Sequence, residues 1–135
     1  MREITVDAAV EKIAEVTDFV DEQLDEMGCP VKIQMQINIA VDELLGNIAR
    51  YAYGRDGGSA AVRVERAENP RAAVITFTDS GIPYNPLLRE DPDTSLTAEQ
   101  RKIGGLGIYI VKKSMDEVMY EFRDGQNVLT IRKNF

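Results

Sequence analysis

The sequence predicts an α+β fold: a two-layer α/β sandwich in which helices cover one face of a mostly antiparallel sheet. Hydrophobic residues recur every two residues in some segments, as in strands, and at about 3.6 residues in others, as in helices. The predicted order is strand, helix, helix, two strands, a long connection, helix and two strands. Strands joined by short turns pair antiparallel. With 135 residues, 44% of them hydrophobic, the chain can bury one core, and we expect a single domain over residues 1–135.

The first half of the chain begins with a short strand, because Ile4 and Val6 alternate with polar neighbours. Helical spacing from Ala8 to Met27 then predicts an amphipathic helix. Its expected buried stripe is Val10, Ile13, Val20, Leu24 and Met27. A break at Gly28-Cys29-Pro30 separates it from a second helix that begins near Val31 and ends near Gly54. The expected buried face of this second helix is Ile33, Ile37, Ala40, Val41 and Leu44.

The second half is predicted to hold two pairs of strands separated by a helix. Strands are expected over 61–65 and 73–78, joined across Asn69-Pro70. Residues 80–103 contain Pro83, Pro86 and Pro92 without a sustained period, so we expect a long connection of the length found in functional lids or disordered segments, and we expect Ile82 to Ile103 to act as a lid. A third helix with an apolar face follows: Ile108, Val111, Met115 and Val118. Closing strands are predicted over 118–122 and 128–132, on either side of a turn at Asp124-Gly125.

Composition excludes several classes of function. The net charge is −7 with no clustered basic stretch, so we expect no nucleic-acid or membrane partner. The chain has no histidine, which excludes Ser-His-Asp and Cys-His catalysis and histidine metal ligands. The lone Cys29 cannot form an internal disulfide and is interpreted as a structural thiol. Without a signal-peptide pattern or an 18-residue apolar run, the chain is expected to be soluble and cytoplasmic.

The first candidate site is a carboxylate and an amide on the second helix. Glu43 and Asn47 are four residues apart, so their side chains project from the same helix face. A carboxylate can accept a proton, and an amide oxygen is a hard ligand suited to Mg²⁺. Asn47 and the neighbouring Gly46 both have low helix propensity. A helix with a purely structural role would seldom contain both. Taken alone, the pair is also compatible with a solvated helix face.

The second candidate follows the apolar strand, at Asp79-Ser80-Gly81. An aspartate with glycine two residues later is ordinary turn chemistry. Asp79 at the end of a buried strand can also accept a hydrogen bond from an amino group such as that of adenine. Gly81 would then let the backbone pass close to a flat ring.

The third candidate is the glycine cluster Gly104, Gly105 and Gly107 before the third helix. Glycine-rich turns at a helix N-terminus expose amide groups that suit phosphate. The cluster is neither a Walker P-loop nor a dinucleotide fingerprint, because the flanking residues differ. A flexible helix start is the other interpretation.

Together, and in this order, the three motifs resemble the N box and the two glycine boxes of the GHKL ATPase superfamily. Within it the chain resembles the small anti-sigma-factor serine/threonine kinases and related ATP-binding regulators. The resemblance covers essentially the whole chain. The segments that carry it are 40–47, 52–53, 79–86, 104–109 and 115–118.

This resemblance implies a Bergerat ATP-binding fold, ATP and Mg²⁺ as cofactors, and roles for individual residues. Glu43 matches the family's general base and Asn47 its Mg²⁺ ligand. Asp79 matches the adenine-reading carboxylate, with Gly81 beneath the base. The phosphates are expected at the glycine box: Gly104, Gly105 and Gly107.

Arg101, just before the box, stands where relatives carry a basic residue near the terminal phosphate, and we expect it to close on that phosphate as part of the lid. Two positions depart from the family pattern. Tyr51 replaces a common histidine, and Gly46 replaces a larger residue.

The function implied by the resemblance is that of a Mg-ATP-dependent serine/threonine protein kinase and anti-sigma factor. Its expected substrate is an STAS-type anti-sigma-factor antagonist, with a sigma factor and a second copy of the chain as further partners. The alternative is a regulatory module that binds ATP and a protein partner without phosphotransfer. A hydrolytic clamp or a histidine-kinase ATP domain would need a transducer or a phosphoacceptor histidine that the expected single domain lacks.

Overall fold

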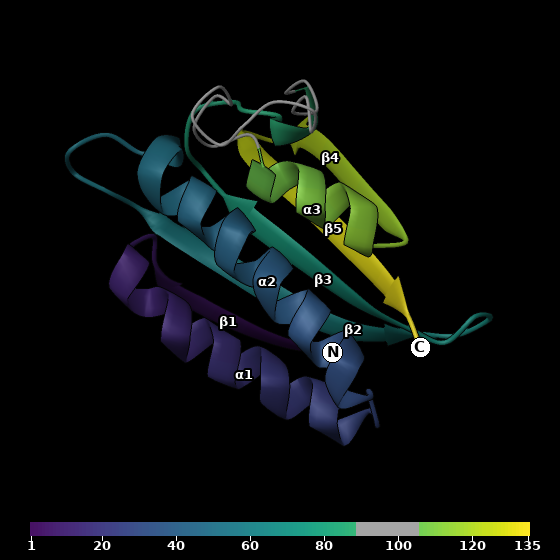
Figure 1. Cartoon of the computed structure of the whole chain (residues 1–135). Helices are drawn as coiled ribbons and strands as arrows, with labels where there is room; N and C mark the ends of the chain where they lie inside the picture. Colours follow the sequence, from purple (N-terminus) through teal and green to yellow (C-terminus); the bar gives the residue numbers. More distant parts are fainter. Residues whose placement is uncertain (89–105) are drawn as a thin grey trace.

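The computed structural model describes residues 1–88 and 106–135 (Figure 1). The strands are β1 (Arg2–Asp7), β2 (Ser59–Ala67), β3 (Ala72–Asp79), β4 (Glu117–Arg123) and β5 (Gln126–Asn134). The α-helices are α1 (Ile13–Glu26), α2 (Val31–Asn47) and α3 (Leu106–Ser114). Short helical turns are η1 (Val10–Lys12), η2 (Ile48–Ala52) and η3 (Pro86–Leu88). The predicted α+β fold is confirmed: helices lie over one face of an antiparallel sheet (Figure 1).

The five strands lie in the order β1-β2-β3-β5-β4, and every neighbouring pair is antiparallel. Two hairpins, β2-β3 and β4-β5, are joined by the pairing of β3 with β5. This pairing places the last residue of β3, Asp79, directly opposite Asn127 near the start of β5. The sheet therefore brings together two polar residues that are far apart in the sequence.

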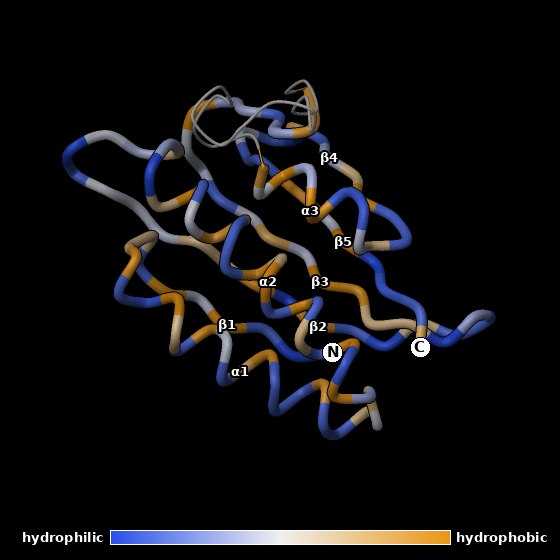
Figure 2. The backbone as a smooth tube through the Cα atoms, viewed as in Figure 1, coloured by the Kyte–Doolittle hydropathy of each residue, from blue (hydrophilic) through white to orange (hydrophobic). Residues whose placement is uncertain are grey.

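The core lies between the sheet and the helices. Alternate residues of the central strands point inward, as the period of two requires. These buried strand residues are Val62, Val64, Ile75, Phe77, Leu129 and Ile131. They pack against buried helix residues: Val16, Val20, Leu24, Ile37, Val41, Ile108 and Val111. Figure 2 shows hydrophobic stretches along β3 and on parts of α2 and α3, with hydrophilic residues in the hairpin turns.

The first helix differs from the prediction in its start and in its buried face. Helical structure begins with the turn η1, and the α-helix proper begins only at Ile13. Val10 is exposed, so it does not belong to the buried stripe. Val16 and Gln23 are buried instead, because the stripe follows the helix that begins at Ile13. The predicted break at residues 28–30 is confirmed, with Gly28 at a φ of 75°.

The third helix ends earlier than predicted. Met115 and Val118 were expected on its face, but α3 stops at Ser114 and Val118 belongs to β4. Lys133 Nζ donates to the carbonyl of Ser114 at 2.7 Å, which satisfies a carbonyl at the helix end. The Asp116 amide donates to the carbonyl of Arg132 at 2.9 Å, so the chain has already joined the sheet there.

The lone cysteine lies in the core, as expected of a structural thiol. Cys29, in the turn between α1 and α2, is part of the buried core cluster. Burial, and then the nearby Asp25 carboxylate, raise the pKa of the Cys29 thiol. Among the residues placed in the structure, no helix is both long and apolar enough to cross a membrane.

Candidate functional site

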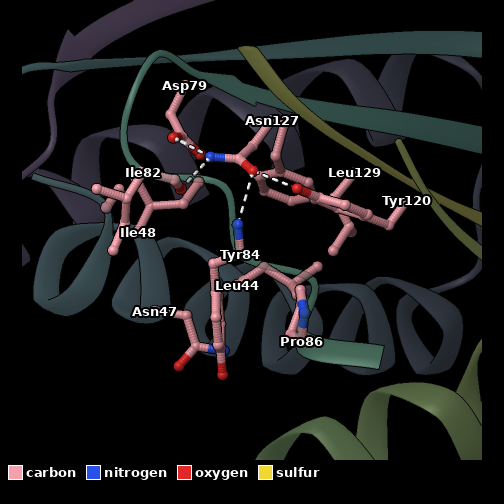
Figure 3. A pocket seen from close by; sticks show the side chains of 12 residues that line it. Leu44, Asn47, Ile48, Asp79, Ile82, Tyr84, Pro86, Tyr120, Asn127 and Leu129 are labelled. Carbon is pink, nitrogen blue, oxygen red and sulfur yellow. Dashed lines mark hydrogen bonds between the residues drawn. The ribbon is translucent and has the colours of Figure 1, made fainter. Parts of the chain in front are cut away.

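A hollow of about 440 Å³, part of it open to solvent, lies between the end of α2 and the ends of the central strands (Figure 3). Its walls are mostly apolar or aromatic: Leu44, Ile48, Phe77, Tyr84, Tyr120 and Leu129. Polar side chains enter it at three places: Asn47, Asp79 and Asn127. Apolar walls with a few fixed polar groups suit a flat organic ring that is read at its edge.

Asp79 is the carboxylate at the inner end of the hollow, and only 5% of it is exposed. Asp79 is the last residue of β3. Its side chain is on the same face of the sheet as that of Phe77, the face that the helices cover. Its Oδ1 accepts from the Gly81 amide and from Asn127 Nδ2, both at 2.9 Å. Because Oδ1 already has two donors, Oδ2 is the oxygen with capacity to accept a hydrogen bond from a ligand.

Gly81 lies against the backbone at the end of the turn η2. A Cβ on Gly81 would overlap the carbonyl oxygen of Ala52. The next amide, of Ile82, donates to that same carbonyl at 2.9 Å. The structure thus gives Gly81 a packing reason to be glycine, while its predicted place beneath an adenine ring stays a prediction.

We expect Gly81→Ala to destabilise the protein, because the added methyl meets backbone that cannot rotate away. The expected loss is about 1 to 3 kcal/mol in the free energy of unfolding, measured by urea denaturation. Gly54→Ala is the matched control, since Gly54 has open space around its Cβ position. Equal stability of the two variants would contradict the close approach of Gly81 to Ala52.

Of the carboxylate and amide predicted on α2, Asn47 lines the hollow, and Glu43 lies one turn before it. Asn47 is the last residue of α2 and only 6% exposed. Its buried Nδ2 has no hydrogen-bond partner among the described residues. A buried N–H without a partner is costly, and of the described residues that line the hollow Asn47 is the one that has such a group, so it can meet a ligand there. A half-turn of the side-chain amide brings its oxygen to this position.

Glu43 lies one turn before Asn47 and meets the start of α3. A Cβ on Gly107 would overlap the carboxylate of Glu43. The structure therefore places the predicted base directly against one glycine of the predicted phosphate box. The positive end of α3 favours negative charge at this point, whether carboxylate or phosphate.

The other residues predicted for this region are Arg101, Gly104 and Gly105, which lie outside the described residues, as does most of the predicted lid. The two departures from the family pattern are neighbours. The Arg50 guanidinium lies over Gly46, so that a Cβ on Gly46 would be 3.0 Å from Arg50 Nη2. The same guanidinium lies 6.0 Å from the centre of the Tyr51 ring. Tyr51 in turn lies 6.1 Å from Tyr84 at the rim of the hollow.

Sequence reasoning missed Asn127 and Tyr120. Asn127 Nδ2 donates to Asp79 and, at 2.8 Å, to the carbonyl of Ile82. Its Oδ1 accepts from the Tyr84 amide at 3.1 Å and from the Tyr120 hydroxyl (Figure 3). The sequence offered no local signal for them, because Asn127 lies between the predicted turn at 124–125 and the strand predicted from residue 128, where asparagine is ordinary.

No group of three or more Cys, Asp or Glu side chains that could hold a metal occurs within residues 1–88 and 106–135. A divalent cation here would depend on Asn47 together with oxygens of the nucleotide. Mg²⁺ is commonly bound in this way, through one or two protein oxygens and substrate phosphates.

A family model described as "Histidine kinase-like ATPase domain" matches residues 6–133. The serine/threonine-protein kinase BtrW of Bordetella bronchiseptica is 26% identical over 100 residues, which cover 74% of this chain and 70% of the relative. The serine-protein kinase RsbW of Bacillus thuringiensis is 26% identical over 129 residues, which cover 94% of this chain and 81% of the relative.

Two solved structures share the fold. A chain of the SiaB-SiaC complex from Pseudomonas aeruginosa matches with a TM-score of 0.64 and 18% identity, over 100% of this chain and 90% of that one. The RsbU and RsbW domains of a Mycobacterium tuberculosis protein match with a TM-score of 0.64 and 15% identity. The latter match covers 99% of this chain but only 32% of the longer protein.

Proposed function

The chain belongs to the histidine kinase-like ATPase domain family, and from this membership, which implies ATP binding, we propose that it is a Mg-ATP-dependent serine/threonine protein kinase. Its substrate would be a protein of the STAS class, and it would act as an anti-sigma factor. Two relatives at 26% identity are named as serine or serine/threonine kinases, which supports protein phosphorylation over other reactions of the family.

The adenine would lie in the hollow, with its amino group on Asp79. The apolar walls exclude water from the ring faces, and the buried carboxylate supplies an acceptor at the ring edge. An acceptor in this place favours a 6-amino purine over a 6-oxo purine, because the latter presents an oxygen instead of a donor.

Magnesium would be held by Asn47 and the phosphates of the nucleotide. The Asn47 side chain, whose Nδ2 has no partner among the described residues, fits this group once its oxygen is turned to the ion, since an amide oxygen is a hard ligand suited to Mg²⁺. When bound, the ion would neutralise phosphate charge during transfer. The residues of this chain would supply the orientation of the nucleotide and the acceptance of the substrate proton.

The observation that carries the proposal is the contact of the Glu43 carboxylate with Gly107 at the start of α3. A helix N-terminus is the preferred place for phosphate, so the carboxylate would stand beside the phosphate that is transferred. The Glu43 carboxylate would not help to bind the phosphate, because two negative charges repel. It can instead accept the proton of an incoming serine or threonine hydroxyl.

Phosphorylation would weaken the complex with the partner. A phosphate adds a charge of about −1.5 to −2 at neutral pH, and the chain already carries a net charge of −7. The unphosphorylated partner would therefore compete with a sigma factor, and the phosphorylated one would leave. A homodimer is a further expectation from the family resemblance.

The direct test is incubation of the protein with ATP labelled at the γ-phosphate and purified STAS-domain proteins from the same genome, with and without EDTA. We expect label on a serine or threonine of one partner, and none when Mg²⁺ is removed. If ATP binds but no partner is labelled, the alternative holds: a module that binds ATP and a partner without transfer.

A further inference from the structure

One buried amide, that of Asn127, uses its full hydrogen-bonding capacity at the rim of the hollow. Its two N–H groups donate to Asp79 Oδ1 and to the carbonyl of Ile82. Its oxygen accepts from the Tyr84 amide and the Tyr120 hydroxyl. A primary amide has two donors and two acceptor sites, so this network leaves none of them for a ligand.

The four partners fix which way the amide points. A flipped Asn127 would direct its nitrogen at the Tyr84 N–H and its oxygen at the Asp79 carboxylate and the Ile82 carbonyl. Donors would then face donors and acceptors would face acceptors. Because only 6% of Asn127 is exposed, water cannot relieve these mismatches. Asn127 Nδ2, and not its oxygen, is therefore the atom that faces Asp79.

The consequence for Asp79 is a fixed carboxylate plane. The Gly81 amide and Asn127 Nδ2 both donate to Oδ1, so any carboxylate plane between this one and its equivalent half-turn loses both bonds. The same asparagine secures Ile82 and Tyr84, which follow Asp79 and form the rim of the hollow (Figure 3). One side chain of β5 thus determines the position of the base-reading group and of the rim.

We propose that Asn127, held by Tyr120, is a positioning residue that makes Asp79 selective for a 6-amino purine. This inference rests on the proposed function, because it concerns the nucleotide assigned to the hollow. Asn127 itself does not contact the base. It holds Oδ1 of Asp79 inside the protein, so that Oδ2 is left toward the hollow, where a 6-amino group can donate to it and a 6-oxo group cannot.

The test compares the binding of ATP and ITP, which differ in the amino or oxo group at ring position 6, by calorimetric titration. In Asn127→Ala we expect the preference for ATP over ITP to fall by about tenfold, the equivalent of one hydrogen bond to a charged group. The loss should come from weaker ATP binding, with ITP binding little changed. Tyr120→Phe removes only one hydroxyl and should give a smaller change in the same direction.

Two controls separate positioning from general damage. Val64→Ala removes a buried side chain of β2 away from the hollow, so it should lower stability without changing the ATP to ITP ratio. Gln126→Ala, next to Asn127, removes only an exposed side chain that reaches Ser80 and should behave as the parent. A second readout is hydrogen exchange at the Tyr84 amide, which should speed up in Asn127→Ala because its acceptor is gone.

An unchanged ATP to ITP ratio in both Asn127→Ala and Tyr120→Phe would overturn the inference while leaving the proposed function intact. So would an equal loss of both nucleotides, which is the result of a purely structural role. A parent protein that binds ATP and ITP equally would overturn the adenine assignment itself, and this inference with it.

Discussion

Glu43→Gln is expected to abolish phosphotransfer while leaving ATP binding almost unchanged. A positioned general base contributes about 10²- to 10⁴-fold to rate, and glutamine cannot accept the proton of a hydroxyl. The substitution keeps the length of the side chain, so its contact with Gly107 at the start of α3 is retained. The measurement is the rate of labelling of the protein partner, paired with calorimetric titration of ATP.

Asp42→Asn is the matched control for this variant. Asp42 is the neighbouring residue of α2 and is exposed, so the substitution removes the same charge without touching the start of α3. It should transfer phosphate at the parental rate. Parental transfer by Glu43→Gln would show instead that Glu43 is not the base, while a large loss of ATP binding would give it a role in holding nucleotide.

Most of the fold could be predicted because each element carries its own spacing. The apolar period of α2 and the apolar run of β3 are local. Both elements begin within one residue of the prediction, and the helix predicted to end near Gly54 is divided into α2, which ends at Asn47, and the turn η2. The start of α1 was wrong because Val10 continues the helical spacing but lies in a separate, exposed turn. The end of α3 was wrong because Val118 fits both a helix face and a strand, and only its pairing with Ile131 decides between them.

Residue spacing alone could group site residues only where they are close in sequence, and the grouping of the three motifs came from the family resemblance. Glu43 and Asn47 share a helix face by spacing, and Asp79 and Gly81 share a turn. Asn127 could not be placed in this way, because it is 48 residues from Asp79 and meets it only through the pairing of β3 with β5. No local pattern encodes that register.

Asp79→Asn is expected to reverse the choice of purine with little loss of stability. The Gly81 amide and Asn127 Nδ2 both require an acceptor, so the oxygen of the new amide must take the place of Oδ1. Its nitrogen is then forced to face the ligand, where a donor meets the donor of the adenine amino group. We expect ATP affinity to fall by about tenfold to a hundredfold, the cost of an unsatisfied buried polar group.

The same fixed nitrogen can donate to the oxygen of a 6-oxo purine, so ITP should bind the variant better than ATP does. Because both internal hydrogen bonds survive, the midpoint of urea unfolding should stay close to that of the parent. Calorimetric titration of both nucleotides against the parent and the variant measures the reversal. Undiminished ATP affinity in Asp79→Asn would remove Asp79 from base recognition. Equal weakening of ATP and ITP would mean that the amide turns freely, contrary to the two donors that hold its oxygen.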